Sequence, residues 1–292
     1  MKALVTGSAG FIGRRMVAAL VGRGYHVNAW DIAEGQDARH LFRSNISTPH
    51  SLIVHCAFHV GGRAAIDGNR GLLAKNLELD AAMFDWALRT GQERVLYFSS
   101  SAAYPVELQD EVSAHAECRL MEENLRHPWL MTPDADYGWA KLTGEKLAGN
   151  AAAQGLPVHI VRPFSGYGSD QSLDYPFPSF IDRAKRKVDP FPIWGPGTQV
   201  RDWVHIDDVV AGALAVVDND YREPVNLCTG VGTSMLDLAT LCCEMAGYRP
   251  EFAPNPDAPT GVAYRVGDPT RFHQLYVPKV TLDEGVAMAL ST

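Results

Sequence analysis

The chain has 292 residues, of which 46% are hydrophobic and 21% charged, so it can bury a full core and wholesale disorder is excluded. Its 26 Lys and Arg against 34 Asp and Glu give a net charge of −8, which argues against nucleic-acid or anionic-membrane partners because those need a clustered positive surface. The longest apolar run, 209–217, is far too short to cross a bilayer, and the N-terminus does not resemble a signal peptide. The five cysteines lack CxxC spacing, so we expect reduced thiols in a cytoplasmic protein and no metal site.

The first half of the chain alternates short strand patterns with longer helical patterns, as a parallel α/β sheet requires. The predicted strands are 4–6, 26–30, 51–57, 94–99 and 158–162, and the predicted helices among them are 11–21, 76–90 and 137–148. In the helix 76–90, the apolar stripe expected to face the core is Leu77, Ala81, Phe84 and Leu88.

After Arg162 the prolines are too frequent for one long helix. A helix at 207–217, a strand at 225–228 and a helix at 234–245 follow. The order predicts an α/β fold, a Rossmann-type doubly wound parallel sheet with a smaller C-terminal substrate-binding lobe. We place the dinucleotide-binding domain at 1–165 and the lobe at 166–292, with 200–230 returning to the first domain.

A glycine-rich motif lies between the first predicted strand and the first predicted helix, in the context that a dinucleotide site needs. Gly7 permits a tight turn, Gly10 lets the backbone approach a pyrophosphate, and Gly13 lets the helix pack closely on the sheet. The N-terminus of that helix faces the phosphates with free N–H groups and partial positive charge. The cofactor contacts predicted here are Gly7, Ala9, Gly10, Phe11, Ile12 and Gly13.

Asp31 follows the second predicted strand. A carboxylate at this position accepts hydrogen bonds from the adenosine ribose hydroxyls and repels a 2′-phosphate, so it favours NAD over NADP. Arg14 and Arg15 keep NADP as an alternative cofactor, because their guanidinium groups could reach a 2′-phosphate.

Tyr137 and Lys141 are four residues apart on a predicted helix, so both side chains reach one site. A nearby ammonium stabilises a phenolate, and we therefore expect Lys141 to lower the pKa of Tyr137. A serine cluster that includes Ser100 and Ser101 follows the strand 94–99. Ligands of open α/β sheets bind beyond the carboxyl ends of the strands, so these hydroxyls are expected to face the cofactor.

Taken together, these motifs resemble the extended short-chain dehydrogenase/reductases that act on nucleotide sugars. The resemblance covers nearly the whole chain. The features that carry it are the glycine loop, Asp31, Asn76, the serine cluster, Tyr137 with Lys141, and Arg201-Asp202-Trp203. Within this family, the chain looks most like the GDP-mannose 3,5-epimerases, at Gly61-Gly62 with Asn69, Ala103-Tyr104-Pro105 and 222–226.

The resemblance implies catalytic roles for three residues. Tyr137 is the general base that takes a sugar hydroxyl proton as hydride leaves to NAD, Lys141 holds the nicotinamide ribose, and Ser100 is the helping hydroxyl, with Ser101 as the alternative. Arg201 and Arg265 resemble arginines that clamp a nucleotide diphosphate, which a planar guanidinium can bind bidentately. Further contacts implied are Ala57 and Asn76 for the cofactor, and His59, Gly61, Ser101 and Ser165 for the substrate.

The chain also departs from the pattern of the GDP-mannose 3,5-epimerases that it resembles. The 3,5-epimerases carry an acid/base cysteine at the position of Ala102 in this chain. Their partner lysine would fall within 169–175, which contains no lysine. They also carry an asparagine at the position of Ser165. Proton exchange at C3 and C5 needs two groups on the ring faces, so epimerisation at those carbons is not expected in the usual form. The Asp-Glu pair of 4,6-dehydratases is absent as well, which argues against water elimination.

We therefore predict an NAD-dependent nucleotide-sugar epimerase that oxidises a ring hydroxyl, most simply at C4, and then returns the hydride. Two alternatives stay open: a GDP-sugar isomerase, such as a 3,5-epimerase, in which His59 or His205 replaces the missing acid/base groups, and a non-catalytic NAD-sensing regulator. The expected partner is a nucleotide-diphosphate sugar, with a GDP-sugar favoured. We also expect a homodimer through the helices 76–90 and 137–148, and a lid in the long segment between Ser100 and Tyr137.

Overall fold

The computed structural model describes residues 1–45, 48–68, 71–125 and 132–292. Asn69, one of the residues behind the resemblance, lies outside the described residues. None of the helices in the described ranges is both long and apolar enough to cross a membrane.

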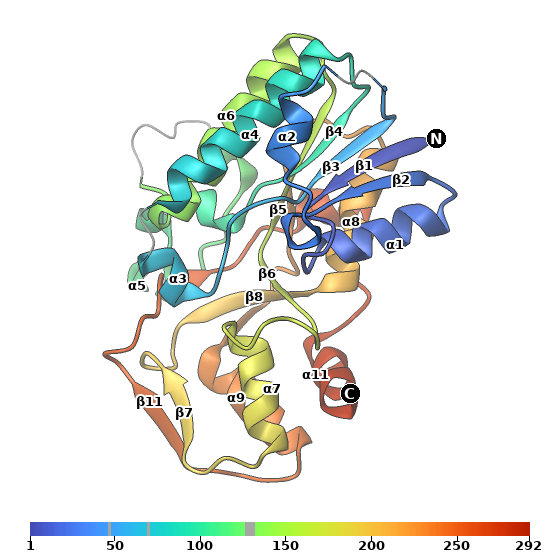
Figure 1. The fold of residues 1–292 in the computed structure, drawn as a ribbon. Helices are drawn as coiled ribbons and strands as arrows, with labels where there is room; N and C mark the ends of the chain where they lie inside the picture. The colour runs from blue at the N-terminus through green and yellow to red at the C-terminus, as the bar shows by residue number, and fades with distance from the viewer. Residues whose placement is uncertain (46–47, 69–70, 126–131) are drawn as a thin grey trace.

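A six-stranded parallel sheet forms the first part of the molecule, with the strand order β2-β1-β3-β4-β5-β9 (Figure 1). Its strands are β1 (Lys2–Thr6), β2 (His26–Trp30), β3 (Leu52–His55), β4 (Val95–Phe98), β5 (Val158–Pro163) and β9 (Val225–Leu227). The chain moves outward from β1 in both directions, so the sheet has a switch point between β1 and β3, where ligands of such sheets bind. The predicted Rossmann-type fold is confirmed.

Helices cover both faces of this sheet, and each face has its own hydrophobic core (Figure 1). On one face are α2 (Ala38–Phe42), α4 (Leu72–Arg89) and α6 (Ala135–Ala153), and on the other are α1 (Gly13–Gly22) and α8 (Ile206–Asp218). Strand residues alternate between the two cores, as the pleat requires: Val5 packs towards α1, and Leu4 towards α2 and α4. The helix α3 (Arg63–Gly68) follows β3.

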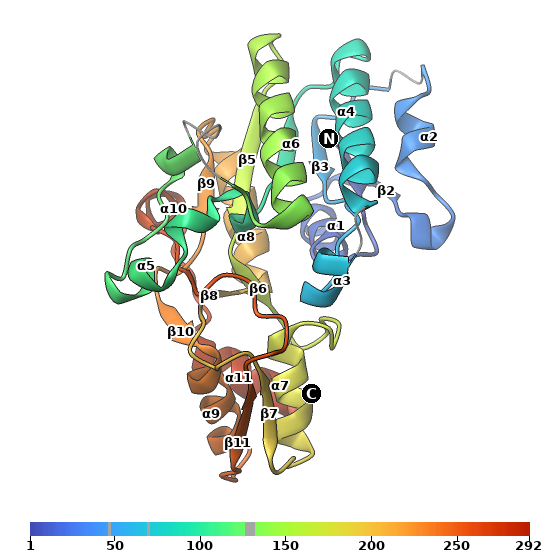
Figure 2. The same ribbon diagram turned by 90° about the vertical axis from the view of Figure 1, so that its left-hand side faces the viewer.

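The second part of the molecule lies beyond the carboxyl ends of the strands (Figure 2). A small sheet holds β6 (Ser165–Tyr167), β8 (Val200–His205), β10 (Gly232–Ser234) and β12 (Tyr264–Arg265), and a ribbon pairs β7 (Phe191–Trp194) with β11 (Phe252–Asn255). The helices α7 (Pro176–Lys185), α9 (Met235–Met245) and α11 (Leu282–Ser291) pack on them around a third core. The helix α10 (Thr270–Leu275) packs back on β9 and α8.

The segment between β4 and α6 contains only short helices in its described part: η2 (Ser101–Ala103), η3 (Val106–Leu108), α5 (Glu111–His115) and η4 (Glu122–Leu125). Another short helix, η1 (Ile32–Glu34), follows β2. Leu120 makes a bridge with Gly267, and the backbone of Tyr264 donates to that of Gln109. This segment is therefore tied to the strand that carries Arg265.

Candidate active site

A cavity of about 980 Å³ lies at the carboxyl ends of the parallel strands and reaches into the second part of the molecule. Of the residues predicted from the sequence for the site, all but Asn76, Lys141 and the alternative acid/base residue His205 line it. Those lining residues come from the turns after β1, β2, β3 and β4, from the start of α6, and from β6, β8 and β12. The fold thus brings the predicted cofactor, catalytic and substrate residues to one site.

The glycine loop after β1 is shaped for a phosphate group. Gly7 has φ +68°, and a Cβ there would lie 2.6 Å from the backbone nitrogen of Ala57. At Gly13, a Cβ would lie 1.9 Å from the carbonyl oxygen of Gly7. Gly10 lines the cavity, and a Cβ on it would approach only the Gly7 oxygen, at 3.1 Å. A Cβ at Gly10 would therefore occupy space inside this loop. Without it, the loop forms a cradle that fits a dinucleotide pyrophosphate.

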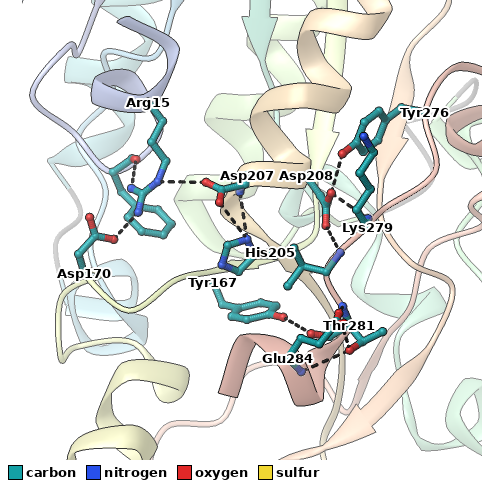
Figure 3. Close-up of polar contacts among 12 residues, drawn as sticks. Arg15, Tyr167, Asp170, His205, Asp207, Asp208, Tyr276, Lys279, Thr281 and Glu284 are labelled. Carbon is teal, nitrogen blue, oxygen red and sulfur yellow. Dashed lines mark hydrogen bonds and ion pairs between the residues drawn. The ribbon is translucent and has the colours of Figure 1, made fainter. Parts of the chain in front are cut away.

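Asp31 follows β2 and is fixed by the backbone: its carboxylate accepts from the N–H of Ala9 at 2.9 Å and of Ala33 at 2.8 Å. The two arginines that kept NADP open as a cofactor are both paired with the Asp170 carboxylate. Arg14 donates to it at 2.5 Å. Arg15 donates to it at 2.6 Å (Figure 3). A carboxylate therefore stands in the cavity at the end of β2, where the sequence predicts the ribose contact, and the neighbouring guanidinium groups are held by Asp170.

Tyr137 lines the cavity near the start of α6, and its ring packs edge-on against Phe58 at 5.6 Å. Burial raises the pKa of its phenol, while a hydrogen bond with the Ser100 side chain and the charge of Arg265 oppose that rise. The expected lowering by Lys141 is not seen. The reason is geometric: the Lys141 ammonium donates to the carbonyl oxygen of Phe98 at 2.7 Å and lies over the Phe58 ring, 3.4 Å from its centroid.

Asn76 acts on the backbone beside the cavity. Its amide nitrogen donates to the carbonyl oxygen of His59 at 3.0 Å, and its amide oxygen accepts from the N–H of the same residue at 2.8 Å. Since Asn76 is 1% exposed, it shapes the turn after β3 rather than the cavity surface. The predicted apolar stripe of α4 is partly wrong: Ala81 is exposed, whereas Asn76 and Asp80 are buried, because this face of the helix meets the site.

A cluster of three arginines and one carboxylate lines the cavity on the side of the second part. Asp134 accepts from Arg63 and from Arg265, both at 2.8 Å. Arg201 donates only to carbonyl oxygens among the described residues, those of Val200 at 2.8 Å and Thr260 at 3.1 Å. Burial and the charge of Arg265 lower the pKa of Arg201 to about 9. Among the described members of this cluster, three guanidinium groups face one carboxylate, so their summed charge favours an anion.

Two members of this cluster, Arg63 and Asp134, were not predicted from the sequence. Their signals are weak: Arg63 directly follows Gly61-Gly62, and Asp134 precedes Tyr137 by less than one helical turn. Arg265 is also held by Gln109, which is fully buried and accepts from its Nε. The predicted lid segment therefore supplies a residue that orients an arginine of the cavity.

A family model described as the NAD dependent epimerase/dehydratase family matches residues 3–228. The chain belongs to this family. The family description states the cofactor, and the structure provides the cradle for it, so NAD is confirmed as the predicted cofactor. The resemblance drawn from the motifs is confirmed as well.

Relatives of this epimerase/dehydratase family member cover almost all of the chain. It is 26% identical over 309 residues to GDP-mannose 3,5-epimerase of Arabidopsis thaliana, with 98% of this chain and 80% of the relative covered. It is 27% identical over 311 residues to dTDP-4-dehydro-6-deoxy-D-allose reductase of Streptomyces bikiniensis, covering 93% and 89%. Among solved structures, MoeE5 in complex with UDP-glucose and NAD is 27% identical, with a TM-score of 0.82 and coverage of 100% and 98%. These relatives differ in reaction, so the reaction has to be argued from the residues of this chain.

The two histidines weighed as acid/base groups lie in different places in this family member. His59 lines the cavity, next to the turn that Asn76 holds. His205 does not line it; its Nδ1 accepts from the N–H of Asp207 at the start of α8, and its ring packs against Tyr167 (Figure 3). The remaining predicted substrate contacts, Gly61, Ser101 and Ser165, line the same cavity as Tyr137 and the arginine cluster. His205 is therefore a capping residue, and His59 stays the candidate.

Proposed function

We propose that the protein is an NAD-dependent nucleotide-sugar epimerase that transiently oxidises a ring hydroxyl, most simply at C4. One observation carries the proposal: Tyr137, with Ser100 at its hydroxyl, shares a single cavity with the dinucleotide cradle and with the cationic cluster of Arg63, Arg201 and Arg265. A sensor that only binds NAD has no need of a paired phenol and serine hydroxyl or of a second anion site.

The chemistry follows from the positions of these groups. NAD supplies a hydride acceptor that can later return the hydride to the same sugar. Tyr137 takes the hydroxyl proton through its phenol oxygen, and Ser100 orients that oxygen by its hydrogen bond. Lys141 lies one turn further along α6, behind the cavity lining, and its proposed role is to hold the nicotinamide ribose. Because burial raises the pKa of Tyr137, the cationic surroundings have to favour its ionised form for proton transfer.

The substrate class follows from charge. A nucleotide-diphosphate sugar carries two phosphate charges, and the cluster presents a surplus of guanidinium groups around Asp134. Similarity to GDP-mannose 3,5-epimerases supports a GDP-sugar. A panel of GDP-, UDP- and dTDP-sugars, with products identified by NMR, tests this assignment. Turnover of a UDP-sugar alone would overturn the GDP preference while leaving the reaction class intact.

The decisive variant is Tyr137→Phe, which removes the phenol oxygen and keeps the ring on Phe58. We expect turnover to fall at least about 10²-fold while NAD binding stays intact, because the oxygen serves proton transfer. Full turnover in this variant contradicts the proposed role.

A 3,5-epimerase in which His59 supplies the acid/base group is the second candidate, favoured by the place of His59 in the cavity. Incubation in D₂O separates the two reactions. Deuterium at C3 or C5 of the product supports the second candidate, and its absence from both carbons supports C4 chemistry.

We further propose that the protein is a homodimer through α4 and α6, which lie side by side on one face of the sheet (Figure 1). Trp139 on α6 is 42% exposed, an apolar side chain that a partner would cover. Light scattering at micromolar concentration is expected to give twice the chain mass; a monomer mass contradicts this assembly.

A further inference from the structure

Behind the cavity, a chain of buried polar groups links the cofactor loop to Lys141. Thr6, the residue before Gly7, has its hydroxyl 2.8 Å from Nδ1 of His55. On the other side of the ring, Nε2 of His55 lies 3.1 Å from Oδ1 of Asp80. The second carboxylate oxygen, Oδ2, accepts from the Tyr97 hydroxyl at 2.6 Å. Thr6, Tyr97 and Asp80 are fully buried, and His55 is 2% exposed.

The donors in this chain all point towards the carboxylate. The backbone N–H of Ala57 donates to the Thr6 hydroxyl at 3.5 Å, so that hydroxyl can donate in turn to Nδ1 of His55. A neutral imidazole with its proton on Nε2 then donates to Asp80. The Tyr97 hydroxyl is the second donor to Asp80. Both hydrogen bonds at this carboxylate are therefore donated to it, and neither requires a proton on Asp80. The network is therefore satisfied by an ionised carboxylate.

An ionised carboxylate in this position needs a compensating charge, because a buried charge is costly without one. The ammonium of Lys141 is 5.4 Å from the centroid of the Tyr97 ring, whose hydroxyl binds Asp80. The helix α6 packs closely against Asp80: at Gly144, three residues after Lys141, a Cβ would lie 2.6 Å from Oδ2 of Asp80. Lys141 and Asp80 therefore both contact Tyr97, and all three residues are buried.

The other ionisable groups around Lys141 are already accounted for. Glu145 on α6 is bound by the Arg162 guanidinium at 2.8 and 2.7 Å, which neutralises its charge. Burial raises the pKa of Cys56, after β3, to about 12, so its thiol stays neutral. The phenol of Tyr137 also has a raised pKa and is neutral at pH 7. Asp80 is thus the described carboxylate near Lys141 whose charge has no guanidinium partner.

We propose that Asp80 is a positioning residue whose buried carboxylate, held by His55 and Tyr97, keeps Lys141 protonated. This rests on the role given to Lys141 in the proposed function. Burial lowers the pKa of Lys141 to about 8, and the charge of Asp80 opposes that fall. A neutral residue at position 80 therefore makes Lys141 lose its proton at a lower pH.

The test is the pH dependence of NAD binding, measured by calorimetry on the full chain without sugar. In the unmodified protein the affinity is expected to fall with a midpoint near pH 8, as Lys141 loses its proton. Asp80→Asn and Asp80→Thr both remove the charge, and both should move the midpoint down by about one pH unit. Asp85→Asn is the matched control, since it removes an exposed carboxylate from the same helix; its midpoint should stay in place.

Lys141→Met separates this inference from the proposed function. Loss of the alkaline transition in Lys141→Met, with a lowered midpoint in the neutral Asp80 variants, supports both. If Lys141→Met lacks the transition but the folded Asp80 variants keep the original midpoint, the role of Asp80 is wrong and that of Lys141 stands. If Lys141→Met keeps the transition, the role of Lys141 in the proposed function fails and the inference fails with it. Circular dichroism identifies the variants that fold, and two different neutral residues guard against a packing defect at one of them.

Discussion

Arg201 and Arg265 face the same cavity, yet their removal should change stability in opposite directions. Burial lowers the pKa of Arg201 to about 9 from 12.5. Because the folded value lies below the unfolded one, the charged side chain destabilises the fold at every pH below about 9, and pH 7 lies well inside that range. At about 1.4 kcal/mol per pKa unit, the upper limit of this cost is about 5 kcal/mol. The side chain lines a cavity that water can enter, so we take about 2 kcal/mol as the realistic figure.

Arg201→Met removes that cost, and water in the cavity can bind the carbonyl oxygens of Val200 and Thr260 that lose their donor. We expect a gain of about 1 kcal/mol in the free energy of unfolding, or a rise of about 2 °C in Tm. Arg265→Met instead leaves the amide oxygen of Gln109 buried without its donor and takes one of two partners from Asp134. We expect it to lose about 2–4 kcal/mol.

Both variants should weaken the binding of GDP about 10- to 100-fold, because each removes a charge-assisted contact to phosphate. Thermal unfolding without ligand and calorimetric titration with GDP measure the two effects separately. Arg249→Met is the control, since that side chain is 86% exposed and does not line the cavity; it should change neither. A fall in Tm for Arg201→Met as large as that for Arg265→Met would refute the reasoning, because it would mean that Arg201 stabilises the fold.

Two further predictions follow from close contacts in the fold. Gly7→Ala should lower the free energy of unfolding by at least about 2 kcal/mol, because it combines a positive φ with a Cβ 2.6 Å from a backbone nitrogen. Gly10→Ala should mainly weaken NAD binding. Calorimetry and chemical denaturation of both variants check this contrast, and equal losses of stability would contradict it. Arg162→Met should lower the free energy of unfolding by about 3–5 kcal/mol, because it leaves the Glu145 carboxylate buried without its partner. Chemical denaturation measures this loss. Adding Glu145→Gln to the same chain should recover most of it if the pairing argument holds.

The sheet and the dinucleotide loop could be predicted from the sequence because their signals are local. Turn glycines, the length of each apolar run and the helix after Gly13 lie within a short stretch of chain, and all of them recur in the structure. The end of β2 at Trp30, directly before Asp31, is local in the same sense. Each of these features depends on neighbours in sequence, which a reading of the chain can see.

The parts of the site that sequence reasoning missed are pairings across long stretches of chain. The helix α4, the strand β4 and several short helices separate Asp134 from Arg63 in the chain, and nothing near either residue in sequence indicates the other. In α4, period and hydropathy placed Ala81 on the buried face, but the helix buries Asn76 and Asp80 instead. A polar residue on a buried face can be recognised only once its partners are known, and here they are His59, His55 and Tyr97.

The acidic net charge gives the arginine cluster its significance. At −8 the chain as a whole repels an anion, but charges farther away than about 10 Å are largely screened at ordinary ionic strength, so the local groups decide what the cavity binds. One carboxylate, Asp134, bridges two of the arginines and fixes them, while Arg201 keeps its charge without such a bridge. An arginine that only stabilised the fold would be expected to have a carboxylate partner, as Arg162 does. The unbridged charge of Arg201 is therefore best explained by an anionic ligand, and the stability gained on its removal is the measurable sign of that role.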